Sequence, residues 1–179
     1  MTTSTPLSLP PGYPAAFEEH ATLRDGRSVF IRPVVPSDRA ELAFELEHAD
    51  PETLYHRFFR TSLRVDEQLL THLTVLDYRW RFALAAFSDA GVAIARYEAT
   101  TRPAEAEIAV AVKPAWRRLG LGTLLLKRLE EAARQNGIAR MRADFLAENE
   151  SARALIAAAG FNPPVYDQGV GSVERDLAR

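Results

Sequence analysis

The spacing of apolar residues changes several times along the chain and predicts a sheet combined with helices. Two short apolar runs flank Asp25-Gly26, a dipeptide typical of the tight turn of a β-hairpin. Further strands are predicted over 81–87, 91–100, 105–112 and 140–146, with two short ones near 165–166 and 172–174. We therefore expect an α/β protein built around a mixed sheet.

Three helices are predicted between the hairpin and the strand at 81–87. Ser37 has the side chain of a helix cap, and Pro51 suits the first turn of a helix, where its missing N–H does no harm. The predicted helices cover 38–48, the segment from Pro51 through Phe59, and 66–73.

Two later helices each follow a predicted strand. Between Leu121 and Ala133, leucine and alanine recur at helical spacing, which is the strongest helical pattern in the chain, and Asn136-Gly137 marks its end. Asn149 is predicted to cap a last helix, which ends before Gly160 in the left-handed conformation.

The first 17 residues differ in composition from the rest. They hold four of the 11 prolines, five serines and threonines, and no charged side chain. Such a segment has little apolar surface to bury, so we expect a disordered tail over 1–17 and a single domain over 18–179. We find no internal repeat and no second domain in the sequence.

Composition excludes several classes of function. The 22 Lys and Arg against 24 Asp and Glu give a net charge of −2, which argues against a nucleic-acid-binding protein. The absence of cysteine excludes disulfides, thiolate zinc sites and a cysteine nucleophile, and the four histidines show no metal-ligand spacing. No apolar run approaches the roughly 18 residues of a membrane helix. The N-terminus lacks the basic start of a signal peptide, so we expect a cytoplasmic protein without a metal.

The segment 117–123, Arg-Arg-Leu-Gly-Leu-Gly-Thr, lies between a predicted strand and the strongest predicted helix. Backbone N–H groups at a helix start are unpaired and favour an anion, and glycines let a ligand approach the backbone closely. A P-loop is excluded, because it needs four residues between its glycines and a Lys-Ser/Thr pair after them. A dinucleotide-binding loop is excluded as well, because Leu125 stands where the third glycine belongs.

The remaining pattern, Arg-x-x-Gly-x-Gly from Arg117, resembles the GNAT superfamily of acyl-CoA-dependent N-acyltransferases. A second pattern over 149–161, Asn-x-x-Ala-x-x-Leu-Ile-x-x-x-Gly-Phe, is similar to that family's second cofactor motif. The resemblance covers the chain from about residue 28 onward. It implies a GNAT fold, in which helices flank a central mixed, mostly antiparallel twisted sheet with a V-shaped cofactor cleft.

The resemblance also implies how acetyl-CoA is bound. Main-chain groups at the end of the strand 105–112 would pair with the pantetheine arm, and N–H groups of the glycine loop would hold the pyrophosphate. Asn149, which also has the features of a helix cap, and Ser151 would lie near the pantetheine. The cofactor-binding residues implied in this way are Val110, Ala111, Val112, Arg117, Arg118, Leu119, Gly120, Leu121, Gly122, Thr123, Asn149 and Ser151.

Direct acyl transfer needs a neutral amine, so a general base is expected. Strand alternation places Glu105 and Glu107 on one face of the strand 105–112, unless a bulge, which the resemblance implies here, alters the register. The segments 55–59, 95–97 and 106–109 are similar to the bacterial protein lysine acetyltransferases of the Pat type. That resemblance implies Glu107 as the general base.

One position departs from the family pattern. Many GNAT enzymes have a tyrosine after the leucine of the second motif, which protonates the departing thiolate, and this chain has Ile156 there. The thiolate could leave without an acid, since a free thiol has a pKa of about 8.5. Alternatively, Tyr97 or Tyr166 could supply the proton.

The leading hypothesis is an acetyl-CoA-dependent N-acetyltransferase that modifies an amine, most plausibly a lysine side chain of a protein. Two alternatives stay open. The acceptor could be a small polyamine, amino acid or antibiotic, or the chain could be a non-catalytic acyl-CoA-binding module. We expect neither a nucleic acid nor a membrane as partner.

Overall fold

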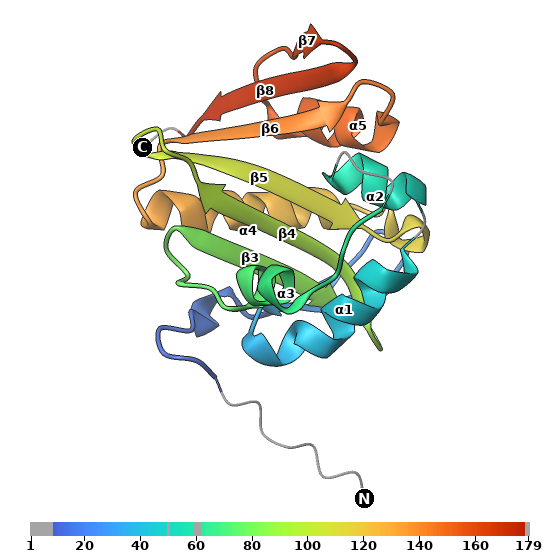
Figure 1. Cartoon of the computed structure of the whole chain (residues 1–179), viewed down its shortest axis with the longest axis vertical. Helices are drawn as coiled ribbons and strands as arrows, with labels where there is room; N and C mark the ends of the chain where they lie inside the picture. The colour runs from blue at the N-terminus through green and yellow to red at the C-terminus, as the bar shows by residue number, and fades with distance from the viewer. Residues whose placement is uncertain (1–8, 50, 59–61, 178–179) are drawn as a thin grey trace, which may run out of the picture.

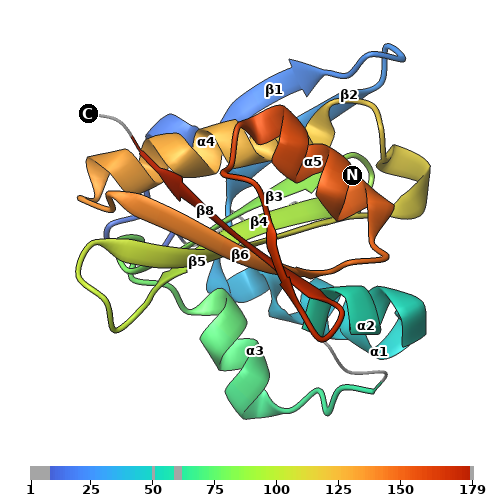
Figure 2. The ribbon, with the colours of Figure 1, turned by 90° about the horizontal axis from the view of Figure 1, so that it is seen from above.

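The computed structural model describes residues 9–49, 51–58 and 62–177, and shows an eight-stranded sheet with helices on both faces (Figures 1 and 2). The strands are β1 (Glu19–Thr22), β2 (Ser28–Pro33), β3 (Arg81–Phe87), β4 (Gly91–Ala99), β5 (Glu105–Val112), β6 (Arg140–Leu146), β7 (Val165–Asp167) and β8 (Val170–Asp176). The helices are α1 (Arg39–His48), α2 (Pro51–Phe58), α3 (Glu67–Thr74), α4 (Leu121–Gln135) and α5 (Glu150–Ala159). Short 3₁₀ turns cover Ala15–Phe17, Pro36–Asp38 and Pro114–Trp116.

The strand order is β1-β2-β3-β4-β5-β6-β8-β7. All neighbouring strands are antiparallel except β5 and β6, which run parallel. This agrees with the predicted mixed, mostly antiparallel sheet. The parallel pair holds together for only three residue pairs, and both strands then continue apart from each other (Figure 1).

The helices divide between the two faces of the sheet. In the view of Figure 2, α4 and α5 lie on one face, whereas α1, α2 and α3 lie on the other. The main core forms under α4, where its buried leucines pack against the strands. These leucines are Leu121, Leu125, Leu126 and Leu129.

The alternation of β4 and β5 separates core residues from polar ones. Tyr97 pairs with Ile108 and both are buried in the core. Their neighbours Glu98 and Glu107 pair with each other on the opposite face. The register runs without a shift from Ala93↔Val112 to Ala99↔Ala106, so the bulge that the family resemblance implied in this strand is wrong for this chain.

Several predicted local features are confirmed. The hairpin around Asp25-Gly26 joins β1 and β2, and Gly26 has a φ of +87°. Asn149 caps α5, accepting a hydrogen bond from the N–H of Ala152 at 3.0 Å, and Gly160 ends the helix in the left-handed conformation.

The predicted cap at Ser37 is wrong. Ser37 lies inside a 3₁₀ turn, and Asp38 is the residue that precedes α1. The Asp38 carboxylate does not cap α1, because it accepts hydrogen bonds from the guanidinium of Arg32 at 2.8 and 2.6 Å and from the N–H of Val35 at 2.9 Å. A contact with β2 has therefore replaced the local cap.

The N-terminal segment is partly packed. Residues 1–8 of the predicted tail lie outside the described residues, as does Phe59 at the end of the predicted second helix. Phe17 is only 5% exposed and contacts Phe82 edge to face, with ring centroids 5.2 Å apart. Packing therefore begins ahead of Glu18, because an aromatic residue at the end of the proline-rich segment reaches the core. In the part of the chain described above, no helix is long and apolar enough to cross a membrane.

We expect Gly171→Ala to destabilise the fold. Gly171 pairs with the buried Phe145 across β8 and β6, and an added Cβ would lie 2.5 Å from Cζ of that ring. The ring has to move, so we expect the free energy of unfolding to fall by about 1–3 kcal/mol in urea denaturation. In a Phe145→Ala background, Gly171→Ala should lower the free energy of unfolding much less. An equal cost in both backgrounds would contradict this explanation.

Candidate functional site

The end of the pairing between β5 and β6 leaves an open strand edge. The last matched pair is Glu107↔Arg142, after which β5 continues for five residues, to Val112. The N–H of Thr100 donates to the carbonyl of Glu105, and the N–H of Lys113 donates to the carbonyl of Val92, both at 2.9 Å.

These two hydrogen bonds identify which residues of β5 face β4. Hydrogen-bonded positions alternate along an antiparallel strand, so odd-numbered residues, Ala111 among them, bond to β4. The carbonyl of Ile108 and the backbone groups of Val110 and Val112 then face the open edge. This edge can accept an extended ligand as an additional strand.

The glycine loop leads from β5 to the start of α4. Arg118 and Gly120 have positive φ angles of 61° and 90°, so the backbone turns sharply before Leu121. Within the described residues, none of the six backbone N–H groups from 118 to 123 has a hydrogen-bond acceptor. Unpaired N–H groups at a helix start carry partial positive charge and bind phosphate groups. The loop therefore fits a pyrophosphate.

Gly122 lies where the open edge and the helix start meet. A Cβ at this position would lie 3.7 Å from side-chain atoms of Val112, at the end of β5, and of Leu155 in α5. An alanine would touch both neighbours, and a larger side chain would fill the space between them. Glycine therefore keeps a gap open beside the N–H groups of the loop.

Two cations flank the loop. The Nε of Arg117 donates to the carbonyl of Val112 at 3.0 Å, which holds this guanidinium at the end of the open edge. Arg24, on the hairpin between β1 and β2, donates its backbone N–H to the carbonyl of Leu119 at 3.3 Å. Its Nε lies 3.7 Å from the position that a Cβ of Gly120 would occupy.

Arg24 was not predicted, because it lies nearly 100 residues before the loop. Its neighbour Arg27 also reaches this region, with its guanidinium 4.0 Å from the ring centroid of Trp116 and a hydrogen bond of 2.8 Å to the carbonyl of Ala115. No local spacing in the sequence indicates this long-range contact. The hairpin thus holds the loop from outside and adds positive charge to it.

The second predicted motif lies on α5. The Asn149 side chain uses its oxygen to cap the helix, and Ser151 is exposed in the first turn. Leu155, in the same helix, faces Gly122. The two motifs, which are separated by about 30 residues in the sequence, therefore meet around the gap beside Gly122.

Glu107 is exposed on the face opposite the main core. Its partner on β4, Glu98, has one oxygen 3.0 Å from Nε2 of His72 and 3.3 Å from the guanidinium of Arg96. Burial lowers the pKa of Arg96, and the charge of Glu98 opposes that effect. Glu107 and Glu98 therefore place two carboxylates side by side on this face, and the carboxylate of Glu98 is paired with a cation.

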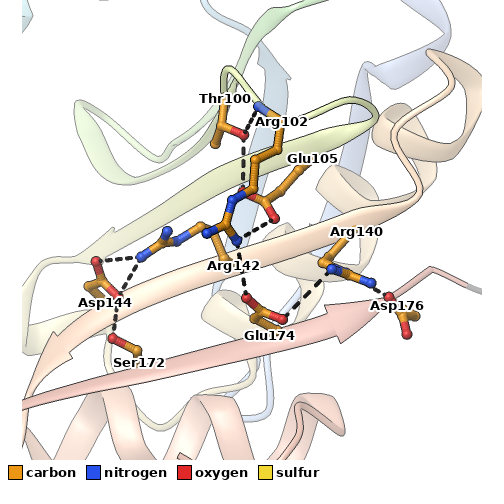
Figure 3. Close-up of polar contacts among 9 residues, drawn as sticks. All are labelled: Thr100, Arg102, Glu105, Arg140, Arg142, Asp144, Ser172, Glu174 and Asp176. Atoms are coloured by element: carbon orange, nitrogen blue, oxygen red, sulfur yellow. Dashed lines mark hydrogen bonds and ion pairs between the residues drawn. The ribbon is translucent and has the colours of Figure 1, made fainter. Parts of the chain in front are cut away.

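Arg142 lies across from Glu107 on β6. Its Nη2 contacts both oxygens of Asp144, at 3.3 and 3.1 Å, and the hydroxyl of Ser172 donates to Asp144 at 2.7 Å (Figure 3). Burial lowers the pKa of Arg142. The carboxylates of Asp144 and Glu107 have a larger opposite effect, so the pKa is raised overall. The sequence patterns gave no signal for this residue.

Tyr97 is excluded as the acid that protonates a leaving thiolate. Its side chain is 0% exposed, and its hydroxyl donates to the carbonyl of Arg79 and accepts from Nδ2 of Asn136, both at 2.8 Å. Burial raises the pKa of Tyr97 to about 12. Because its partners lie on the core side of the sheet, this hydroxyl cannot reach the face that carries Glu107.

Tyr166 is 50% exposed on β7 and packs edge to face on Phe145. Together with Ile156 it lines a cavity of about 630 Å³ beside α5. β7 is the edge strand, and β8 and β6 lie between it and the opening beside β5, so Tyr166 does not border that opening.

Known acetyltransferases resemble this chain in sequence. The model of the acetyltransferase (GNAT) family matches residues 43–161. The chain is 32% identical to acetyltransferase PA5475 of Pseudomonas aeruginosa over 145 residues, 78% of either chain. It is 28% identical to acetyltransferase Pat of Mycolicibacterium smegmatis, covering 87% of this chain but only 47% of Pat.

A solved structure, the GNAT domain of PAT from S. lividans, superposes with a TM-score of 0.83 at 31% identity, over 92% of this chain and 99% of that domain. The splayed strands, the open edge and the glycine loop agree with these matches. The chain belongs to the GNAT family of acetyltransferases.

Proposed function

We propose that this protein transfers the acetyl group of acetyl-CoA directly to an amine, and that the acceptor is a lysine side chain of a protein. One observation carries the proposal. The open edge of β5 runs from Glu107 to Val112, whose side chain lies next to Gly122 among the unpaired N–H groups at the start of α4. A carboxylate for proton transfer and a phosphate-binding loop thus lie at opposite ends of one edge that can bind a strand-like ligand.

Acetyl-CoA matches this arrangement. The N–H groups of residues 118–123, with Arg117, Arg118 and Arg24 around them, would hold the pyrophosphate. The amides of the pantetheine arm would then pair with the backbone groups of Val110 and the N–H of Val112, whose carbonyl accepts from Arg117, and Ala111 would hold this part of β5 to β4. Asn149 and Ser151 would border the arm from the start of α5.

Glu107 would act as the general base. An amine with a pKa near 10.4 is neutral in only about one molecule in 2,500 at pH 7, so removal of a proton precedes attack. Glu107 is exposed and lies at the closed end of the open edge, where the thioester of a bound acetyl-CoA would lie. Its carboxylate would take the proton from the ammonium, directly or through one water molecule.

Two observations support a protein acceptor. Glu107 lies on an accessible sheet face, and the neighbouring strands continue that face with charged side chains such as Arg140 and Glu174 (Figure 3). Such a surface can receive a lysine that projects from a folded protein. The resemblance of the segments 55–59, 95–97 and 106–109 to the protein lysine acetyltransferases of the Pat type supports the same acceptor.

The test is release of CoA from acetyl-CoA by the pure protein, with a mixture of protein acceptors and, separately, with a panel of free amines. We expect release that depends on the protein acceptor and acetyl-lysine in that acceptor. Release with free amines alone would move the proposal to a small-molecule acceptor. If calorimetry shows that acetyl-CoA binds but no acceptor causes release of CoA, the catalytic role of Glu107 is refuted.

Replacement of the proposed base gives a direct prediction. We expect Glu107→Gln to lower turnover by roughly 10²- to 10⁴-fold and to leave acetyl-CoA affinity unchanged, because the base acts on the acceptor. The matched control is Glu98→Gln, its cross-strand neighbour on the same face, whose carboxylate is engaged by His72 and Arg96. If the control loses turnover and Glu107→Gln keeps it, the base has been assigned to the wrong carboxylate.

The gap beside Gly122 gives a second prediction. Gly122→Leu would fill the space between Val112 and Leu155, so we expect calorimetry to show at least a tenfold weaker affinity for acetyl-CoA. Lys127→Leu places the same side chain on an exposed position of α4 and should bind normally. Equal melting temperatures would show that both variants fold. Normal binding by Gly122→Leu would mean that the ligand takes another path.

A further inference from the structure

We propose that Arg142 stabilises the CoA thiolate as it leaves, in place of an acid that would protonate it. This role rests on the proposed function, because it concerns the leaving group of the same transfer. Ile156 has no proton to donate, the hydroxyl of Tyr97 is buried on the other side of the sheet, and Tyr166 lies on β7, which β6 and β8 separate from the opening. The thiolate therefore needs another source of stabilisation, and a cation can provide one.

The fold places Arg142 at the closed end of the opening between β5 and β6. Glu107↔Arg142 is the last pair of the parallel ladder, so the two residues lie on opposite sides of the point where the strands separate. The proposed base occupies one side. The cation occupies the other, and the thioester would lie between them.

Asp144 holds the guanidinium along the part of β6 that has separated from β5. Asp144 lies two residues further along β6, in the part of the strand that has separated from β5, and it binds Nη2 of Arg142 through both of its oxygens (Figure 3). The hydroxyl of Ser172 on β8 fixes Asp144 in turn, at 2.7 Å. Among the described residues, Nη1 and Nε of Arg142 have no hydrogen-bond acceptor, so two donor groups stay available.

Other charges surround this guanidinium. Glu107 on β5 and Glu174 on β8 are its cross-strand partners, and Glu98 lies one strand further away. Bound carboxylates hold the arginine in place and do not remove its charge, because a guanidinium does not deprotonate in proteins. Arg142 can therefore stabilise a negative sulfur but cannot protonate it.

Arg140 provides the contrast. It lies two residues earlier on β6, in the part that is still paired with β5, opposite Glu105. Its Nε donates to Asp176 at 2.9 Å, and its Nη1 lies 4.0 Å from Glu174 (Figure 3). Arg140 has the same charge on the same face, but its acceptors hold it toward β8 and away from the opening.

The step balances without a further reactant. The ammonium gives one proton to Glu107, which passes it to water, and the neutral nitrogen then attacks the thioester carbon to form the C–N bond. As the C–S bond breaks, Glu107 takes the second proton from this nitrogen, and the electron pair stays on sulfur as a thiolate beside Arg142. Water protonates the thiolate after CoA leaves the opening.

The experiment measures the pKa of the CoA thiol while CoA is bound, from the ultraviolet absorbance of the thiolate. A positive charge within about 4–6 Å lowers such a pKa by roughly one to three units. We expect the bound thiol to titrate below the ordinary value of about 8.5 in the wild type, and about one unit or more higher in Arg142→Gln. Arg140→Gln should leave the bound thiol as in the wild type.

Kinetics give an independent readout. Arg142→Gln should lower kcat by about tenfold or more, which is the change that one pKa unit represents, with little change in KM for acetyl-CoA. Arg142→Lys keeps the charge and should recover part of both effects, which guards against a variant that merely misfolds. A bound thiol with the same pKa in the wild type and in Arg142→Gln would overturn the proposal.

The two proposals fail in different ways. If the wild-type protein does not bind CoA, the proposed function is wrong and the role of Arg142 falls with it. If the protein binds CoA and releases CoA from acetyl-CoA in turnover, but the bound thiol does not respond to Arg142→Gln, only the role of Arg142 is wrong.

Discussion

The site depends on one constraint, the early end of the pairing between β5 and β6. A strand inside a sheet satisfies its backbone groups on both sides, whereas β5 loses its second partner after Glu107 and so keeps an unpaired edge. The strands do not close again, because α5 follows β6 directly and its Leu155 packs toward Gly122 on the other side of the gap. A binding edge, a helix start for phosphate and two opposed charges all follow from this separation.

Strand alternation then assigns chemistry to one face and stability to the other. Tyr97 and Glu98 are adjacent in β4, yet Tyr97 is sealed under α4 with both of its hydrogen bonds inside the core, whereas Glu98 lies on the open face beside Glu107. The uninterrupted register carries this division along the whole of β5. Because the two faces differ in this way, Tyr97 in the central strand contributes to packing and not to proton transfer.

The role of each arginine on the open face depends on where its carboxylate partner lies. Arg140 and Arg142 lie two residues apart, and each is held by a carboxylate. Arg140 is drawn toward β8, whereas Asp144 draws Arg142 along β6 into the separated region. At the other end of the edge, Arg24 reaches the glycine loop from a distant hairpin. The positions of the cations at both ends of the open edge thus depend on contacts between strands that are distant in the sequence.

Local pattern was sufficient for the elements and for the phosphate loop. The hairpin at Asp25-Gly26, the start of α4 and the Asn149 cap each depend on residues within a few positions of one another, so the sequence by itself determined them. The failures were long-range. The carboxylate of Asp38 binds Arg32 on β2 and does not cap α1. Tyr97 and Phe17 are buried in the core. Arg24 and Arg142 are placed at the site only by contacts between distant segments. Tertiary structure decided these, because which residues share a face or an edge depends on the register between strands that are far apart in the chain.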